Sequence, residues 1–144
     1  MAVTANSAVT PQTPKNCWAN FIQGTDAAGT WKTLYVSGAN GSKVFGIVAV
    51  NNDGTAHAAS LRLNAGGTTA LAPFVTQTVS INAGNASGTI GQALLTTTQI
   101  GGLGIDQNGN LFLALAASDT LQATYATTLG SSSTLSVFGI AADF

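Results

Sequence analysis

Residues 33–50 read TLYVSGANGSKVFGIVAV, two apolar stretches on either side of the polar, glycine-bearing loop at residues 37–43. Such a loop is found in two very different settings. A glycine-rich loop that ends in Ser-Lys can cradle a phosphate, and a loop of the same composition can simply join two β-strands. The choice between these settings decides the fold class.

The loop lacks the spacing of a phosphate-binding loop. That motif has four residues between its glycines and places Lys before Ser or Thr, between a strand and a helix whose N-terminus faces the phosphates. Here two residues separate Gly38 from Gly41, and Lys43 follows Ser42. The residues after it are apolar and often β-branched, without a helical period. The stretch therefore predicts a connection between two strands, with Asn40 and Gly41 in left-handed conformations.

Period-two stretches separated by Gly, Asn, Asp and Ser clusters recur along the whole chain, which is typical of an all-β sandwich. The predicted strands cover residues 17–23, 30–36, 43–51, 57–64, 75–82, 111–116, 121–129 and 134–141. Residues 92–100 fit either a further strand or a short helix at 93–97. The last three strands are expected to form an up-and-down set. The sequence predicts a single β-sandwich of seven to nine strands.

Residues 1–16 differ from the rest of the chain, because they contain Pro11 and Pro14 and show no strong period. We predict an extended N-terminal arm at residues 1–16 and a β-sandwich domain at residues 17–144. The arm is expected to contact a partner. The arm residues predicted to lie in that interface are Val3, Thr4, Asn6, Val9, Pro11 and Pro14.

Charge is scarce in this chain. Four Lys and Arg and five Asp make 6% of the 144 residues, against about 25% in ordinary soluble domains. A neighbouring molecule can cover a protein surface of Thr, Ser and Asn without the desolvation cost that ions impose. The composition therefore favours an extensive assembly. A secreted or surface β-protein with a Thr- and Asn-rich coat remains the alternative. The net charge of −1 argues against a nucleic-acid partner, which requires a basic face.

Targeting signals are absent from the sequence pattern. The longest apolar run of large residues, FGIVAV at 45–50, is far shorter than a membrane-spanning helix. The N-terminal residues have neither a basic region nor an apolar region of the kind found in secretory signals. A single cysteine, Cys17, fits synthesis in a reducing cytoplasm. We therefore expect cytoplasmic synthesis and no membrane partner.

Asp106 opens the sequence DQNGN, which resembles the start of a calcium-binding loop with oxygen ligands at alternate positions. An EF-hand needs Gly at its sixth position and Glu at its twelfth. This chain has Leu111 and Ala117 at those positions. A turn before the next strand is the preferred interpretation, and an irregular ion site is the alternative.

Catalytic motifs are also missing. His57 and Cys17 are the single histidine and cysteine, no local signature joins them, and the five Asp residues lie scattered in turns. We predict that the protein is not an enzyme and that it uses no cofactor or metal. The aromatic residues Trp18, Trp31 and Tyr35 fit core or interface anchors, or alternatively a sugar-stacking platform.

Four stretches of the sequence resemble a known family. AVTANSAVTPQT at the N-terminus, TLYVSGANGSKVFGIVAV, QIGGLGIDQNGNLFLALAASDTLQATY and the terminal DF are similar to capsid decoration (cement) proteins of tailed bacteriophages. The resemblance implies a jelly-roll-like β-sandwich on the outer surface of an icosahedral head. It also implies a homotrimer that clamps neighbouring subunits of the major capsid protein. The family pattern carries no catalytic motif.

The expected function is therefore that of a structural virion protein, a cement protein that stabilises a phage head by bridging major capsid subunits. The alternative is a carbohydrate-binding or adhesive module of a phage tail or fibre.

Overall fold

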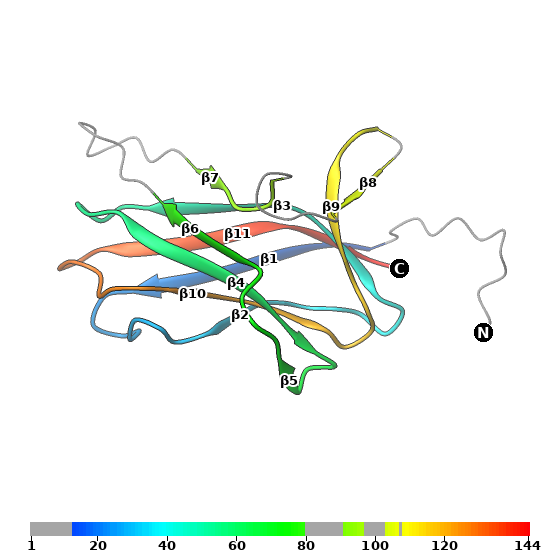
Figure 1. Cartoon of the computed structure of the whole chain (residues 1–144), viewed down its shortest axis with the longest axis horizontal. Coiled ribbons are helices and arrows are strands. Elements are labelled where there is room, and N and C mark those ends of the chain that lie inside the picture. The colour runs from blue at the N-terminus through cyan, green and yellow to red at the C-terminus, as the bar shows by residue number, and fades with distance from the viewer. Residues whose placement is uncertain (1–12, 80–90, 97–102, 107) are drawn as a thin grey trace, which may run out of the picture.

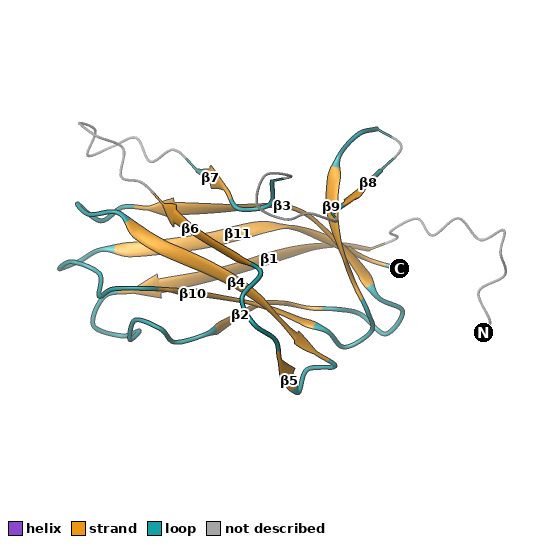
Figure 2. Cartoon of the chain, viewed as in Figure 1, coloured by secondary structure: helices purple, strands orange, loops and turns teal. Residues whose placement is uncertain are grey.

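The computed structural model describes residues 13–79, 91–96, 103–106 and 108–144, which form strands, turns and loops without a helix (Figure 2). Consequently, no helix in these residues is long and apolar enough to cross a membrane. The strands are β1 (Thr13–Ile22), β2 (Lys32–Val36), β3 (Ser42–Asn51), β4 (His57–Ala65), β5 (Thr69–Ala70), β6 (Val75–Val79), β7 (Gln92–Ala93), β8 (Gly104–Ile105), β9 (Leu111–Leu115), β10 (Thr120–Tyr125) and β11 (Thr134–Asp143).

The strands form two antiparallel sheets packed face to face (Figure 1). Sheet A has the order β1-β11-β3-β9-β8, with β7 beside β3, and sheet B has the order β2-β10-β4-β5, with β6 beside β4. Among the described strands, eight remain when the two-residue strands β5, β7 and β8 are set aside. Numbered along the chain, these eight take the order 1-8-3-6 in sheet A and 2-7-4-5 in sheet B. This is the arrangement of a jelly roll, so the predicted β-sandwich is confirmed.

The chain changes sheets at most of its connections, and this corrects one expectation. β9 and β11 belong to sheet A, whereas β10 between them belongs to sheet B, so the predicted up-and-down set is wrong. The sequence leaves a further strand or a short helix at 93–97 open for residues 92–100, and residues 92–96 form β7 and the loop after it rather than a helix. There the Leu94 amide donates to the Ile47 carbonyl at 2.7 Å, extending the contact with β3. Alternation of side chains shows which face a strand buries but not which strand lies beside it.

The core lies between the two sheets and follows the predicted alternation along most strands. Its largest fully buried apolar side chains are Phe21, Val44, Ile47, Leu61, Val79, Leu94, Leu121, Tyr125, Leu135 and Val137. The hydroxyl of Tyr125 is not left unpaired, because it donates to the Asp26 carbonyl at 2.7 Å. Strand β2 departs from alternation, since Leu34 and Tyr35 are both buried. The pairing of β2 with β10 shifts register between Leu121 and Gln122, which rotates both side chains inward.

Strand β1 begins earlier than expected. The sequence predicts residues 13–16 as part of the N-terminal arm, but they pair with β11, with Thr13 opposite Asp143. Pro14 fits there because β1 is at the edge of sheet A, where the missing N–H costs no ladder bond. Residues 1–12 lie outside the described residues.

Candidate interaction surface

The outer face of sheet A is apolar where a solvated sheet is normally polar. Rows of paired residues cross it: Trp18 lies opposite Phe138, and Phe138 lies opposite Val48. In the next row Ile140 lies opposite Phe45. Trp18 is 67% exposed, Phe138 46% and Ile140 60%. We call these five residues the apolar face.

A hollow of about 1140 Å³ opens over this face. Leu95, after β7, lines one part of it, and residues 109–111 at the start of β9 line another. Both strands stand beside β3 (Figure 1). The described residues around the hollow carry no charged side chain. An exposed, uncharged and concave surface of this kind is a common feature of sites that bind another molecule.

The outer face of sheet B is polar by contrast. The hydroxyls of Ser60 and Thr76 lie 2.9 Å apart, and Arg62 Nε donates to Gln122 Oε1 at 2.8 Å. The Arg62 guanidinium also lies 4.1 Å from the centre of the Trp31 ring. Sheet B therefore resembles an ordinary solvent-facing sheet, and the candidate surface lies on sheet A.

The glycine-bearing loop at residues 37–43 contacts a carboxylate, but the carboxylate belongs to the chain itself. Oδ1 of Asp143 accepts hydrogen bonds from Ser42 Oγ at 2.6 Å, from the Gly38 amide at 3.2 Å and from the Tyr35 hydroxyl. These donors hold the pKa of Asp143 below its usual range, with Ser42 the main cause. Burial, together with this carboxylate, raises the pKa of Tyr35 to about 12. The loop joins β2 in sheet B to β3 in sheet A, as the sequence predicted in outline.

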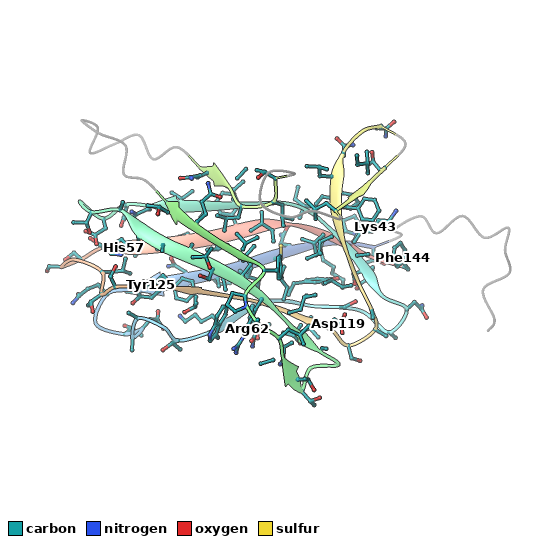
Figure 3. All side chains as sticks on the ribbon, viewed as in Figure 1. Lys43, His57, Arg62, Asp119, Tyr125 and Phe144 are labelled. Atoms are coloured by element: carbon teal, nitrogen blue, oxygen red, sulfur yellow. The ribbon has the colours of Figure 1, made fainter. Side chains whose placement is uncertain are left out.

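Two details of this loop complete its assignment as a strand connection. Gly41 has a φ of +92°, whereas Asn40 is not left-handed, so only half of the predicted pair is confirmed. The ammonium of Lys43 lies 4.4 Å from the centre of the Phe112 ring and 5.7 Å from that of Phe144 (Figure 3). The Lys43 ammonium therefore packs on aromatic rings.

A buried polar cluster lies at the opposite end of the sandwich, near the label of His57 in Figure 3. His57 Nε2 contacts Asp53 Oδ2 at 2.5 Å, and the Gly130 amide donates to the same oxygen at 2.7 Å. On the other side of the ring, His57 Nδ1 lies 3.0 Å from Thr127 Oγ1. The pKa of Asp53 is lowered to about 2, mainly by the hydrogen bond from the Gly130 amide. Burial acts in the opposite direction, and the hydrogen bond with His57 lowers the pKa further. The cluster joins the β3–β4 loop to the β10–β11 loop.

Sequence reasoning treated Asp53 as an ordinary turn residue and missed this pair. The signal available was the spacing of four residues between the single histidine and an aspartate on either side of a turn. The partner atoms on Thr127 and Gly130 come from a distant segment, which no local pattern predicts.

The other candidates for chemistry are separate from one another. Asp106 Oδ1 accepts from the amides of Asn108 at 2.9 Å and Asn110 at 2.8 Å. The Asn110 side chain is the main cause of the lowered pKa of Asp106. The described residues contain no group of three His, Cys, Asp or Glu side chains placed to hold a metal ion. Cys17 is buried in β1 opposite Gly139 of β11, and burial raises its pKa to about 11.

The aromatic candidates fall on different surfaces. Tyr35 is buried, Trp31 is half-buried against Arg62 on sheet B, and Trp18 stands exposed on sheet A. They do not form one platform. Of the predicted arm residues, Pro14 is exposed in β1. The others, Val3, Thr4, Asn6, Val9 and Pro11, lie outside the described residues.

Comparison with known proteins yields two solved structures and no match to a family model or to a curated protein. The chain is 12% identical to a protein in the capsid asymmetric unit of cyanophage Pam1, with a TM-score of 0.47, covering 100% of this chain and 94% of that one. It is 13% identical to a chain of infectious bursal disease virus strain Gx, with a TM-score of 0.28, covering 98% of this chain and 44% of that one. Likenesses at this level do not reveal what the chain binds.

Proposed function

We propose that this chain is a structural virion protein without catalytic activity or a cofactor. More specifically, it is a capsid decoration (cement) protein that binds the outer surface of a phage head and bridges major capsid subunits. The apolar face of sheet A is the observation that carries this proposal, because a free monomer rarely keeps Trp18, Phe138 and Ile140 exposed side by side. The jelly-roll topology is one that capsid proteins use, together with lectins and cupins.

The low charge of the chain supports the same proposal. A binding surface of uncharged side chains buries without the desolvation cost that ions impose. We propose a homotrimer, in which three weak contacts act together. Once one subunit has bound, the others are held at a high effective concentration near their sites, so the trimer binds far more tightly than one subunit.

Reconstitution on particles tests the proposal. Heads that lack this protein are incubated with the purified chain, and bound protein is measured by co-sedimentation and located by cryo-electron microscopy. We expect stoichiometric binding on the outer surface and a higher temperature for DNA release. Phe138→Ser and Ile140→Ser are expected to reduce occupancy at least tenfold, and Arg62→Gln on sheet B is the matched control. Failure of the unmodified chain to bind heads contradicts the proposal.

A carbohydrate-binding module is the second candidate, and one observation favours it. Trp18 is exposed and lines the hollow, and Asn16 and Asn110 line the same hollow with side-chain amides. A sugar ring can stack on such an aromatic ring, and its hydroxyl groups can form hydrogen bonds with such amides. Glycan-array binding that is lost in Trp18→Ala, with head binding absent, identifies this function instead.

A further inference from the structure

The outer edge of β1 is an open edge of sheet A. In the described part of the chain β1 has one neighbour, β11. In an antiparallel pair, main-chain groups of alternate residues face the partner strand, and those of the residues between face away. The Gln23 amide donates to the Ser133 carbonyl, and these two residues continue the register of β1 and β11. The odd-numbered residues of β1 therefore direct their main-chain amides and carbonyls toward β11. The even residues therefore point their amides and carbonyls outward.

The structure closes one end of this edge. The Ile22 amide donates to Asp26 Oδ2 at 2.8 Å, and the Ile22 carbonyl accepts from the amides of residues 25 and 26. The Asn20 carbonyl accepts from Lys32 Nζ at 2.8 Å. At the other end Pro14 has no N–H to donate.

Between these two ends lies a short window on the edge. The outward main-chain groups of Asn16 and Trp18 have no partner among the hydrogen bonds of the described residues. Both residues are exposed, and Trp18 belongs to the apolar face as well as to the window. Extended chain that pairs here gains main-chain hydrogen bonds, and every second side chain lies beside the apolar face.

The residues that lead into β1 have the composition to fill such a window. Residues 2–12, AVTANSAVTPQ, carry no charged side chain, like the hollow beside Trp18. Fully extended, they reach about 36 Å, similar to the length of β1 itself. They are therefore long enough to pair along the edge of a strand such as β1.

Their own copy is a poor acceptor, because of the two prolines. A two-residue hairpin at positions 12 and 13 is closed by hydrogen bonds between residues 11 and 14, and both are proline, without an N–H. Thr13 precedes Pro14, which keeps it extended and out of the left-handed conformation that the hairpin needs. Pairing of residues 2–10 with β1 of the same copy through such a turn is therefore disfavoured.

We propose that residues 2–10 of one copy add as a strand to the β1 edge of a second copy, at Asn16 and Trp18, and cover part of its apolar face. In a dimer, each copy places residues 2–10 on the β1 edge of the other, and in a trimer each copy places them on the next copy around the ring. We call this the exchange. This inference rests on the proposed function only in treating sheet A as an assembly surface.

Sedimentation of the full chain tests the exchange. Deletion of residues 2–10 is expected to weaken self-association at least tenfold. Asn16→Pro is expected to do the same, because it removes an outward N–H without breaking a bond to β11. Asn16→Ala, which keeps that N–H, is the matched control, and circular dichroism verifies that all variants are folded. Unchanged association in the deletion variant overturns the proposal.

Cross-linking identifies the acceptor. Val9→Cys and Val3→Cys are each combined with Asn16→Cys, and non-reducing gels follow mild oxidation, with the buried Cys17 as background. We expect disulfide-linked oligomers from at least one of the two double variants. We expect the same oligomers when the two substitutions are on separate chains that are mixed. A disulfide within one chain overturns the exchange. If deletion of residues 2–10 abolishes head binding but not self-association, the arm binds the capsid protein, so the exchange fails while the proposed function stands.

Discussion

Ser42 and Asp143 are 101 positions apart in the sequence, and Ser42 Oγ donates to Asp143 Oδ1 at 2.6 Å. The contact joins the first residue of β3, next to the β2–β3 loop, to the C-terminal end of β11. Around it the Phe144 amide donates to the Gly41 carbonyl at 3.2 Å, and Asn40 Nδ2 donates to the Phe144 carbonyl at 3.2 Å. The end of the chain therefore holds the loop in place.

Asp143→Asn is expected to lower the free energy of unfolding by about 1–3 kcal/mol, because it replaces a charged acceptor of several hydrogen bonds. Since the folded state lowers the pKa of Asp143, its contribution is complete above the carboxyl pKa of the unfolded chain, near 4, and is lost as the pH falls through the folded pKa. Urea unfolding at pH 7 and pH 3 measures both effects. A variant whose stability matches the wild type at pH 7 contradicts this role.

Asp53→Asn is expected to remove most of the stability that the buried cluster with His57 contributes. Lowering the pKa of Asp53 to about 2 corresponds to roughly 2 kcal/mol, present above pH 4 and lost between about pH 4 and pH 2. The free energy of unfolding of the variant should therefore change less with pH over this range than that of the wild type. A double-mutant cycle with His57→Gln isolates the pair, and a coupling energy near zero would show that the pair does not stabilise the fold.

Gly139→Ala is expected to destabilise the protein by about 1–3 kcal/mol through overpacking. A Cβ at this position overlaps the Gly46 carbonyl and lies 3.0 Å from Cys17 Sγ, where β11 shifts register against β3. Gly54→Ala is the matched control, because a Cβ there has no heavy atom within 4 Å. Thermal unfolding of both variants makes the comparison, and equal melting temperatures would refute the close approach.

Ile47 and Ile140 are isoleucines on neighbouring strands with opposite burial, 0% and 60% exposed. Ile47→Ala is expected to cost about 2–5 kcal/mol, since it leaves a cavity in the core. Ile140→Ala is expected to change stability by less than about 1 kcal/mol, because its side chain is mostly solvated. Denaturant titration of both variants checks the difference. A large cost at Ile140 would mean that the apolar face is part of the core.

The local pattern of residues was enough to predict where most of the longer strands lie. A run that is apolar on both faces predicted β3, and period-two patterns predicted β4 and β11. The predicted bounds of these three strands lie within two residues of the observed ones. The spacing of Gly38 and Gly41 was likewise enough to exclude a phosphate-binding loop. These properties depend only on near neighbours in the chain.

Tertiary structure alone decided which strands pair and which surface is left apolar. Trp18, Phe138 and Val48 form one row only because β1 and β3 both pair with β11. In the same way Asp53 meets Gly130, and Ser42 meets Asp143, through contacts across 77 and 101 positions. A period of two gives the face of a side chain but not its neighbour, because the same alternation fits every pairing of the strands.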